Sequence, residues 1–309
     1  MTSPITAGSP TGSIYDLGYR GYDGPRLGRA HAVRSLFSHS LRSTYGLGRG
    51  VRAKLAPIFL SVFATIPSLA IIAALVLAAR FGESAGELLT EASPVRYDTI
   101  YGLVSTAGIL GLFCAAQAPE LFGRDQRHGI LSLYFARALR RSDYTLARIL
   151  GFVAAVFILV MLPQVVLFLG RVLLSPDIVG AFQRDVPSVP PVLAQSLLTA
   201  FLYGGLAMVV SAYTPRRAYA VAGIIALFVI PDIIATVVAG LGSSLIGTWL
   251  TLISPNSVLA GTNAVLFDVP FGTEFFFIQL PDIAYFVAAA IGIVGSFAIS
   301  IRRFQQISV

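Results

Sequence analysis

Residues able to carry enzymatic chemistry are few and scattered along this chain. The three histidines, His31, His39 and His128, show no H-E-x-x-H or similar ligand spacing, and the single cysteine, Cys114, lies in an apolar run. The sequence contains no G-x-x-x-x-G-K-[ST] phosphate loop, so nothing in it predicts that this chain binds ATP. We find no pair of carboxylates, and no nucleophile with a base, at positions that would lie at the same level along the predicted helices. We therefore expect no catalytic residue, no metal site and no cofactor held by this chain.

One carboxylate lies inside an apolar segment. Asp232 follows Pro231, and no other Asp, Glu, Lys, Arg or His occurs between positions 218 and 240. Ionisable residues are costly at membrane depth, and proline leaves a backbone carbonyl of the preceding turn without its partner. Three roles stay open for Asp232. It could bind a cationic group, hold an outer gate through Arg171 or a partner chain, or remain protonated and satisfy the interrupted helix.

The segment 119–148 combines charged residues with a helical apolar pattern. Leu121 and Phe122 can begin an apolar face, Gly129 permits a break, and Ile130, Leu133 and Tyr134 recur at helical spacing. Ser142 stands where it can cap the following long helix. The pattern predicts a helix-turn-helix that is continuous with that helix, an arrangement that transmits movement as a rigid body.

These residues lie among long apolar segments. The chain has 309 residues, 56% of them hydrophobic and 12% charged, and its mean hydropathy is +0.79. A bilayer core about 30 Å thick needs roughly 20 apolar helical residues per crossing. Six segments meet this requirement, and they predict an all-α polytopic membrane protein. They are Leu55–Ala79, Thr99–Ala118, Ile149–Gly170, Val192–Tyr213, Ala218–Gly240 and Ile283–Ile301.

The charged residues sort to the two sides of the predicted membrane. Most of the 22 basic residues precede the first span, lie between the second and third or the fourth and fifth, or follow the sixth. Most acidic residues fall in the other connections. By the positive-inside rule, both termini are expected to be cytoplasmic in a multi-pass protein of the cell membrane. The arginines are interleaved with apolar runs rather than gathered in one basic domain, which argues against nucleic-acid binding.

The remaining segments complete the expected organisation. We predict a disordered tail over residues 1–30, an amphipathic helix in the headgroup layer over 31–54, and a short C-terminal tail over 302–309. Packing on protein instead of lipid is the alternative for the amphipathic helix. The transmembrane domain covers 55–301. Residues 241–282 are uncharged over much of their length but contain Pro255, so we expect re-entrant or short helices on the outer face, with Trp249 at the interface.

The segment 119–148 resembles the equivalent loop of ABC-2 type membrane subunits, in particular the branch with the membrane protein of the nitrous-oxide-reductase copper-maturation system. That loop reads approximately A-P-E, then R-x-G-x-L-x-L-Y, then R-P-L-x-R and an aromatic residue. The matching residues here are Ala118-Pro119-Glu120, Arg127-His128-Gly129-Ile130-Leu131-Ser132-Leu133-Tyr134, Arg137-Ala138-Leu139-Arg140-Arg141 and Tyr144. Ala138 departs from the pattern, because the family usually has proline there.

The resemblance implies an ABC-2 (type V exporter-like) architecture, a second copy or a related permease as partner, and a separate ABC ATPase that holds ATP and Mg. It implies a permease that couples ATP hydrolysis to export. The alternative is a subunit that passes ATP-driven force to an extracytoplasmic partner without moving a solute. The expected ATPase-coupling residues belong to the loop. They are Glu120, Arg124, Arg127, Gly129, Leu131, Leu133, Arg137, Arg141 and Tyr144.

Small and hydroxylated residues mark one face of each of the first two predicted spans. We expect these residues to line a path for a transported molecule. The alternative is that they allow close helix packing in lipid. Asp232 joins them as a candidate. The candidate translocation path consists of Ser61, Thr65, Ser68, Tyr101, Ser105, Gly108 and Asp232, with Ala115 on the same face of the second span.

Overall fold

The computed structural model describes residues 24, 27–81, 97–106, 108–136, 139–240, 245–269 and 280–307, and within these ranges it contains helices and no strand. The α-helices are α1 (Gly28–Thr44), α2 (Val51–Phe81), α4 (Tyr97–Thr106), α5 (Ile109–Gln117), α6 (Phe122–Arg127), α7 (Leu131–Phe135), α8 (Arg141–Leu173), α9 (Ile178–Asp185), α10 (Val189–Tyr213), α11 (Arg217–Gly240), α12 (Leu245–Leu250), α13 (Pro255–Phe267) and α14 (Asp282–Gln306). Three short 3-10 helices are η1 (Ala118–Glu120), η2 (Val186–Ser188) and η3 (Thr251–Ile253). The predicted all-helical class is confirmed for these residues.

Several helices are long and apolar enough to cross a membrane. Within the described ranges, five pass by themselves, and up to seven pass if each of two bent helix pairs counts as one crossing. In the most apolar windows of α2 and α11 only 17% of the residues are buried. Apolar side chains exposed over such lengths require an apolar solvent, because water would leave them unfavourably hydrated.

The predicted spans and the observed helices agree closely at five of the six positions. The exception is the second, which the sequence presented as continuous. The structure divides it into α4 and α5, and the direction of the chain changes by 54° between the segments 97–104 and 109–127. Gly108 stands at the division with φ of 68°, a left-handed conformation that glycine adopts without a steric penalty. Pro231, by contrast, lies within an uninterrupted α11.

The region expected to hold short outer helices contains a sharp bend. The segments 247–253 and 255–267, which comprise parts of α12, η3 and α13, meet at 101°. Ser254 lies between them, and its hydroxyl accepts a hydrogen bond from the Ser257 amide at 3.2 Å, which caps α13. Trp249 is half exposed on α12. Positions 241–244 and 270–279 of the predicted region lie outside the described residues.

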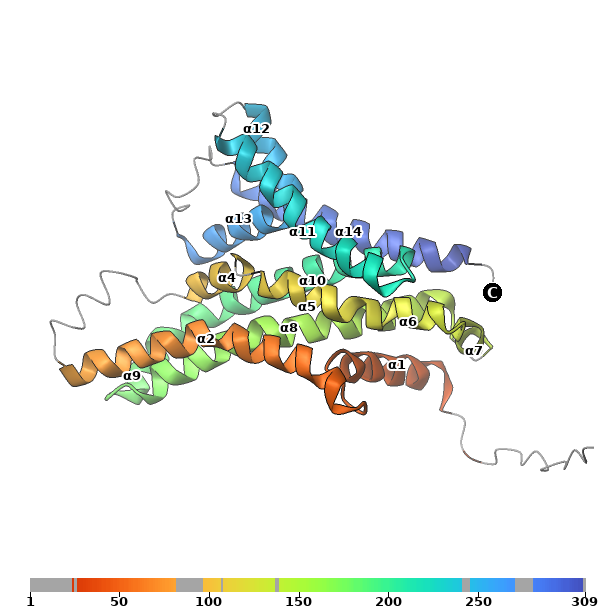
Figure 1. Ribbon diagram of the computed structural model, residues 1–309. Coiled ribbons are helices and arrows are strands. Elements are labelled where there is room, and N and C mark those ends of the chain that lie inside the picture. Colours follow the sequence, from red (N-terminus) through yellow and green to blue (C-terminus); the bar gives the residue numbers. More distant parts are fainter. Residues whose placement is uncertain are drawn as a thin grey trace, which may run out of the picture.

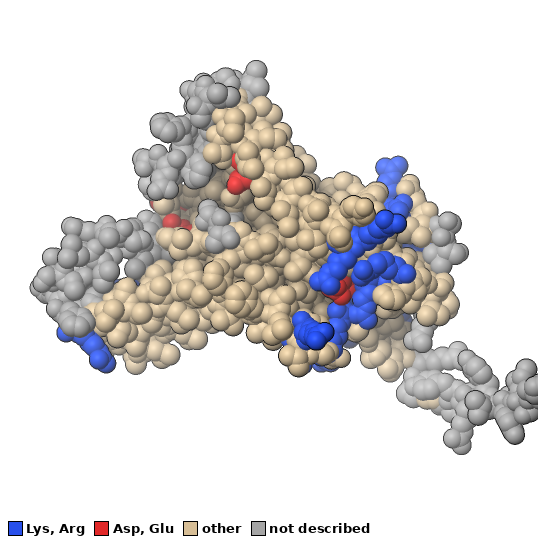
Figure 2. Space-filling view, in the orientation of Figure 1, with Lys and Arg blue, Asp and Glu red and all other residues tan. Residues whose placement is uncertain are grey.

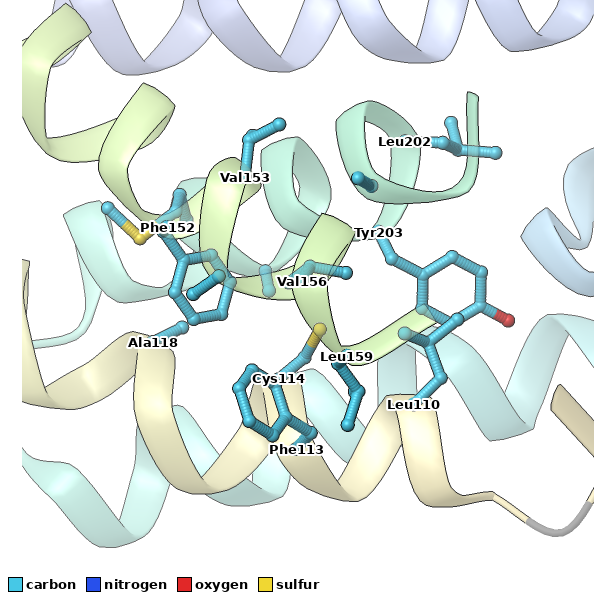
Figure 3. Packing of buried hydrophobic residues seen from close by; sticks show 14 of the residues in the cluster. Leu110, Phe113, Cys114, Ala118, Phe152, Val153, Val156, Leu159, Leu202 and Tyr203 are labelled. Carbon is cyan, nitrogen blue, oxygen red and sulfur yellow. The ribbon is translucent and has the colours of Figure 1, made fainter. Parts of the chain in front are cut away.

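Helix α8 is the centre of the packing, in contact with α1, α2, α10 and α14. Figure 1 shows α8 running alongside α2, α5 and α10, while α11 and α12 diverge from this group. Figure 3 shows Phe113 and Cys114 of α5 near Val156 and Leu159 of α8, with Tyr203 of α10 at the side. These five side chains are all at most 4% exposed. This close packing holds the middle of α8 against α5 and α10.

Helix α1 packs on α8 rather than standing apart from the bundle. It spans Gly28–Thr44 and buries Leu36, Ser40, Ser43 and Thr44. The packing on protein that the sequence left as the alternative is therefore present on this face. A turn separates α1 from α2, within the segment 31–54 that the sequence assigned to the amphipathic helix and its glycine-rich end. Gly46 and Gly48 adopt φ of 68° and 85° in that turn.

Both predicted tails are shorter than expected. Helix α1 already begins at Gly28, while positions 1–23, 25 and 26 of the N-terminal tail lie outside the described residues. At the other end, α14 continues to Gln306 and includes Arg302 and Arg303. The Arg141 guanidinium donates to the carbonyls of Gln305 at 2.8 Å and Ile307 at 2.7 Å, which holds the end of the chain against α8.

Candidate functional site

Basic side chains gather at one end of the molecule, around α6 and the connection between α1 and α2, as Figure 2 shows. We call this the basic end and define it by Arg49, Arg124, Arg127 and Arg217. The loop expected to couple to an ATPase lies here. We call residues 122–135, which comprise α6, the turn at Gly129 and α7, the α6–α7 tip. Gly129 has φ of 62°, so the predicted break in the helix-turn-helix is present.

The predicted coupling residues divide into an exposed and an internal group. Arg124, Arg127, Gly129 and Leu133 are exposed, and Leu133 has 67% of its surface accessible. Leu131 and Tyr144 are buried, at 7% and 0% exposure. The sequence assigned the exposed and the buried residues alike to the ATPase-coupling interface. Only the exposed group forms a surface that another protein could contact, while Arg137 lies outside the described residues.

Glu120 connects three elements. One carboxylate oxygen accepts a hydrogen bond from Arg49 at 3.0 Å, and the other forms an ion pair with Arg217 at 3.2 Å. These bonds join η1 to the α1–α2 connection and to the start of α11. Arg49 also donates to the Ser43 hydroxyl at 2.7 Å. Glu120 therefore uses both oxygens inside the chain, and its contribution to the site is to position η1.

A buried ion pair that the sequence reasoning missed anchors the α6–α7 tip. Asp125 of α6 and Arg148 of α8 are 4% and 2% exposed, and their side chains approach to 2.5 Å. The Tyr144 hydroxyl donates to Asp125 at 2.6 Å, and Arg148 also donates to Tyr134 at 3.1 Å and Ser40 at 3.3 Å. A pair buried this deeply needs such additional hydrogen bonds to offset the loss of hydration.

Aromatic rings enclose this ion pair. The rings of Phe122, Tyr134, Phe135 and Phe304 all lie within 6.0 Å of the Tyr144 ring, measured between centroids. The Arg148 guanidinium lies 5.6 Å from the Tyr134 centroid and 5.7 Å from the Tyr144 centroid. We call Asp125, Tyr134, Tyr144 and Arg148 the anchor cluster. It fixes the tip to the first turns of α8, because each of its members forms a side-chain hydrogen bond to another member.

Two groups near the anchor cluster have shifted pKa values. Partial burial lowers the pKa of His39, and the positive charge of Arg148 lowers it further. His39 is therefore neutral at neutral pH and adds no positive charge beside Arg148. Burial raises the pKa of Tyr45 to about 12, and its hydroxyl donates to the Ala155 carbonyl at 2.9 Å, which links the end of α1 to α8.

The start of α8 is capped differently from the sequence expectation. Ser142 lies inside the helix, and Asp143 supplies the cap by accepting from the Arg140 amide at 3.2 Å. Asp143 also pairs with Arg29 at 2.6 Å on the surface. The predicted cap at Ser142 is wrong because the helix begins at Arg141, one residue before the serine.

The candidate path residues separate into two places. Ser61, Thr65 and Ser68 of α2 are at most 8% exposed. Ser61 and Thr65 donate within α2, to the carbonyls of Pro57 and Val62, and Ser68 donates to the Pro163 carbonyl of α8 at 2.8 Å. Of these three hydrogen bonds, only that of Ser68 joins α2 to a second helix.

Three of the other path residues border a cavity. Tyr101, Gly108 and Asp232 line a space of about 790 Å³ among α4, α5, α10, α11 and α13. The Tyr101 hydroxyl donates to the Val192 carbonyl at 2.7 Å, which fixes α4 on α10. Ser105 lies in α4, and its side chain is outside the described part of the chain. Ala115 is fully buried in α5.

Asp232 and Arg171 are engaged with different partners. Asp232 accepts from Ser254 at 3.0 Å and from Asn256 at 3.4 and 3.5 Å. Arg171 pairs with Asp185 at 3.0 Å, and its guanidinium lies 5.4 Å from the centroid of the Tyr97 ring. Among the described residues, the gate contact between Asp232 and Arg171 is not formed.

Similarity to known proteins was sought at the level of families and of individual sequences. Comparison with protein-family models finds none that matches the chain, and comparison with curated proteins likewise finds no match.

Proposed function

We propose that this chain is the membrane subunit of an ATP-driven exporter of the ABC-2 type, and that a separate polypeptide supplies the ATPase. Six crossings are assigned in this proposal: α2, the bent pair α4 and α5, α8, α10, α11 and α14. The pair α12 and α13 then lies on the outer side as a re-entrant element. By the positive-inside rule, the clustered arginines support a cytoplasmic location for the basic end and both termini.

The observation that carries the proposal is the combination of an exposed tip and an internal anchor. Arg124, Arg127 and Leu133 project where a partner could bind them. Behind them, Asp125 and Arg148 connect the tip to a helix of 33 residues that is apolar enough to cross the membrane. A force applied at the tip therefore reaches the membrane helix without passing through a flexible connection. The loop motif that resembles ABC-2 subunits covers the same residues.

The proposal includes a second permease copy, identical or related. The apolar surfaces of α2 and α11 support it, because Phe59 and Phe63 of α2 and Ile233 of α11 are 43–65% exposed. Lipid covers such surfaces in a monomer, and a second copy would cover part of them in a dimer. Alternating closure of paired ATPases would then move two membrane subunits relative to each other and open an outward path.

Charge reversal at the tip tests the docking assignment. An affinity-tagged chain purified from membranes of its native host should carry an associated Mg-ATP hydrolysis activity. The double substitution Arg124→Glu with Arg127→Glu should lower the activity recovered per tagged chain about tenfold or more, because two favourable charge contacts become repulsive. The tagged chain should still elute as the wild type does, since both residues are exposed.

Arg184→Glu is the matched control, because Arg184 is exposed on α9, far along the chain from the tip. Its associated hydrolysis should equal that of the wild type. Hydrolysis that survives the double reversal would refute docking at the tip. A wild-type preparation that hydrolyses no ATP would refute the proposed function itself.

A further inference from the structure

The cavity beside Asp232 has the size and lining of a site for a small organic molecule. Its volume of about 790 Å³ lies within the range of ligand pockets in proteins. Leu110, Val160, Phe228 and Leu259 contribute apolar surface to it. Tyr203 and Phe228 stack with a centroid separation of 4.2 Å, which forms a flat aromatic wall. Such a lining favours a ligand with an apolar body.

The described part of the lining carries acidic side chains and no basic ones. Asp98 and Asp232 both border the cavity, and none of the lining residues that the structure describes is lysine, arginine or histidine. Charges of one sign in a space with apolar walls produce a strong local potential, because few water molecules screen it. A cation in the cavity lowers the energy of both carboxylates, whereas an anion raises it.

Neutral donors hold Asp232 in place. Ser254 and Asn256 donate to its oxygens, and Ser254 also caps α13, so the carboxylate is fixed against the start of a helix. These contacts orient the group without contributing a formal positive charge. Asn263 adds a buried side-chain oxygen that accepts no hydrogen bond, on a residue that lines the same cavity. The cavity therefore has the Asp232 carboxylate at its border and an unsatisfied acceptor on one of its lining residues.

We infer that this cavity binds an organic cation with an apolar, preferably aromatic, body. The apolar walls would contact the body, and Asp98 and Asp232 would stabilise the charge. This inference rests on the proposed function only in treating the cation as the exported cargo. Binding itself is a property of this chain and can be measured without the ATPase.

The test compares two probes of the same shape and opposite charge, tetraphenylphosphonium and tetraphenylborate. Equilibrium binding is measured with the purified full chain in nanodiscs of phosphatidylcholine, after subtraction of the binding to empty nanodiscs. Tetraphenylphosphonium should bind saturably and about tenfold or more tightly than tetraphenylborate, because only the cation is attracted by the two carboxylates. Equal binding of both probes, or no saturable binding of the cation, would overturn the inference.

Asparagine substitutions identify the site. Asp232→Asn keeps the acceptor for Ser254 and removes the charge, and it should weaken cation binding about tenfold. Asp98→Asn should also weaken cation binding. If Asp232→Asn does not elute as a folded protein, the Asp98→Asn variant provides the test. Asp177→Asn is the control, because Asp177 caps α9, lies outside the cavity lining and is exposed. Its affinity should stay within about twofold of the wild type.

The two proposals fail in different ways. Unchanged cation binding in folded Asp232→Asn and Asp98→Asn would overturn the inference, while ATP hydrolysis by the purified complex would still support the exporter. Cation binding that depends on Asp232, in a chain that brings no ATPase with it, would support the cavity and refute the proposed function.

Discussion

Replacement of Arg148 by methionine is expected to lower the free energy of unfolding by about 3–5 kcal/mol, because it leaves the carboxylate of Asp125 buried without its ionic partner. Asp125 is only 4% exposed, so water cannot take the place of the guanidinium without opening the packing. Tyr134 also loses a hydrogen bond to Arg148. Unfolding of the purified chain in mixed micelles with increasing denaturing detergent would measure the loss.

Two comparisons separate the ion pair from a general effect of removing arginine. Arg29→Met breaks the surface pair with Asp143 and should shift the unfolding midpoint very little, since Arg29 is largely exposed. Asp125→Asn combined with Arg148→Met should be more stable than Arg148→Met alone, because the buried charge is then absent. If the double substitution is no more stable than the single one, the loss does not come from an uncompensated carboxylate.

Substitution of Gly151 by leucine is expected to displace α1 from α8. A Cβ atom at this position would lie 2.9 Å from the Phe37 carbonyl oxygen and 3.3 Å from the Leu41 amide nitrogen, both in the backbone of α1. Backbone atoms cannot rotate away as a side chain can, so the two helices must separate. Overpacking of this kind costs about 1–3 kcal/mol or more.

Hydrogen exchange of the amides in residues 28–44 would report the displacement. In Gly151→Leu these amides should exchange about tenfold or more faster, because α1 loses the partner that covers its buried face. Gly295→Leu is the control, since Gly295 also lies inside a long helix but a Cβ atom there would meet nothing within 4 Å. Unchanged exchange in Gly151→Leu would mean that α1 does not depend on its contact with α8.

The long helices could be predicted from the sequence because their cause is local. A run of about 20 apolar residues is long enough to cross the hydrocarbon core of a bilayer, whatever its neighbours in the fold are. The division between α4 and α5 could not be found in this way. Gly108 is one of several glycines in apolar runs, and only its left-handed conformation in the folded chain distinguishes it from Gly111, which remains helical.

The site was predictable in its location but not in its internal arrangement. The loop motif identified residues such as Leu131 and Leu133 without showing which of them faces inward, because α7 spans only five residues and gives no usable periodicity. Asp125 and Arg148 each appear in the sequence as an ordinary charge of a basic loop. They are 23 positions apart, so their pairing cannot be inferred from local sequence and is seen only in the folded chain. The presence of three aromatic residues near them, Phe122, Tyr134 and Tyr144, was the available signal.

The packing of α1 on α8 also has a consequence for the order of events during synthesis. Tyr45 and its acceptor, the carbonyl of Ala155, are 110 positions apart. At about 5–20 residues per second, a ribosome needs roughly 5–20 s to make that stretch of chain. During this interval α1 has been made and α8 has not. The face of α1 that packs on α8 is therefore without its final partner for its first seconds, and it meets that partner only after α2, α4 and α5 have been synthesised.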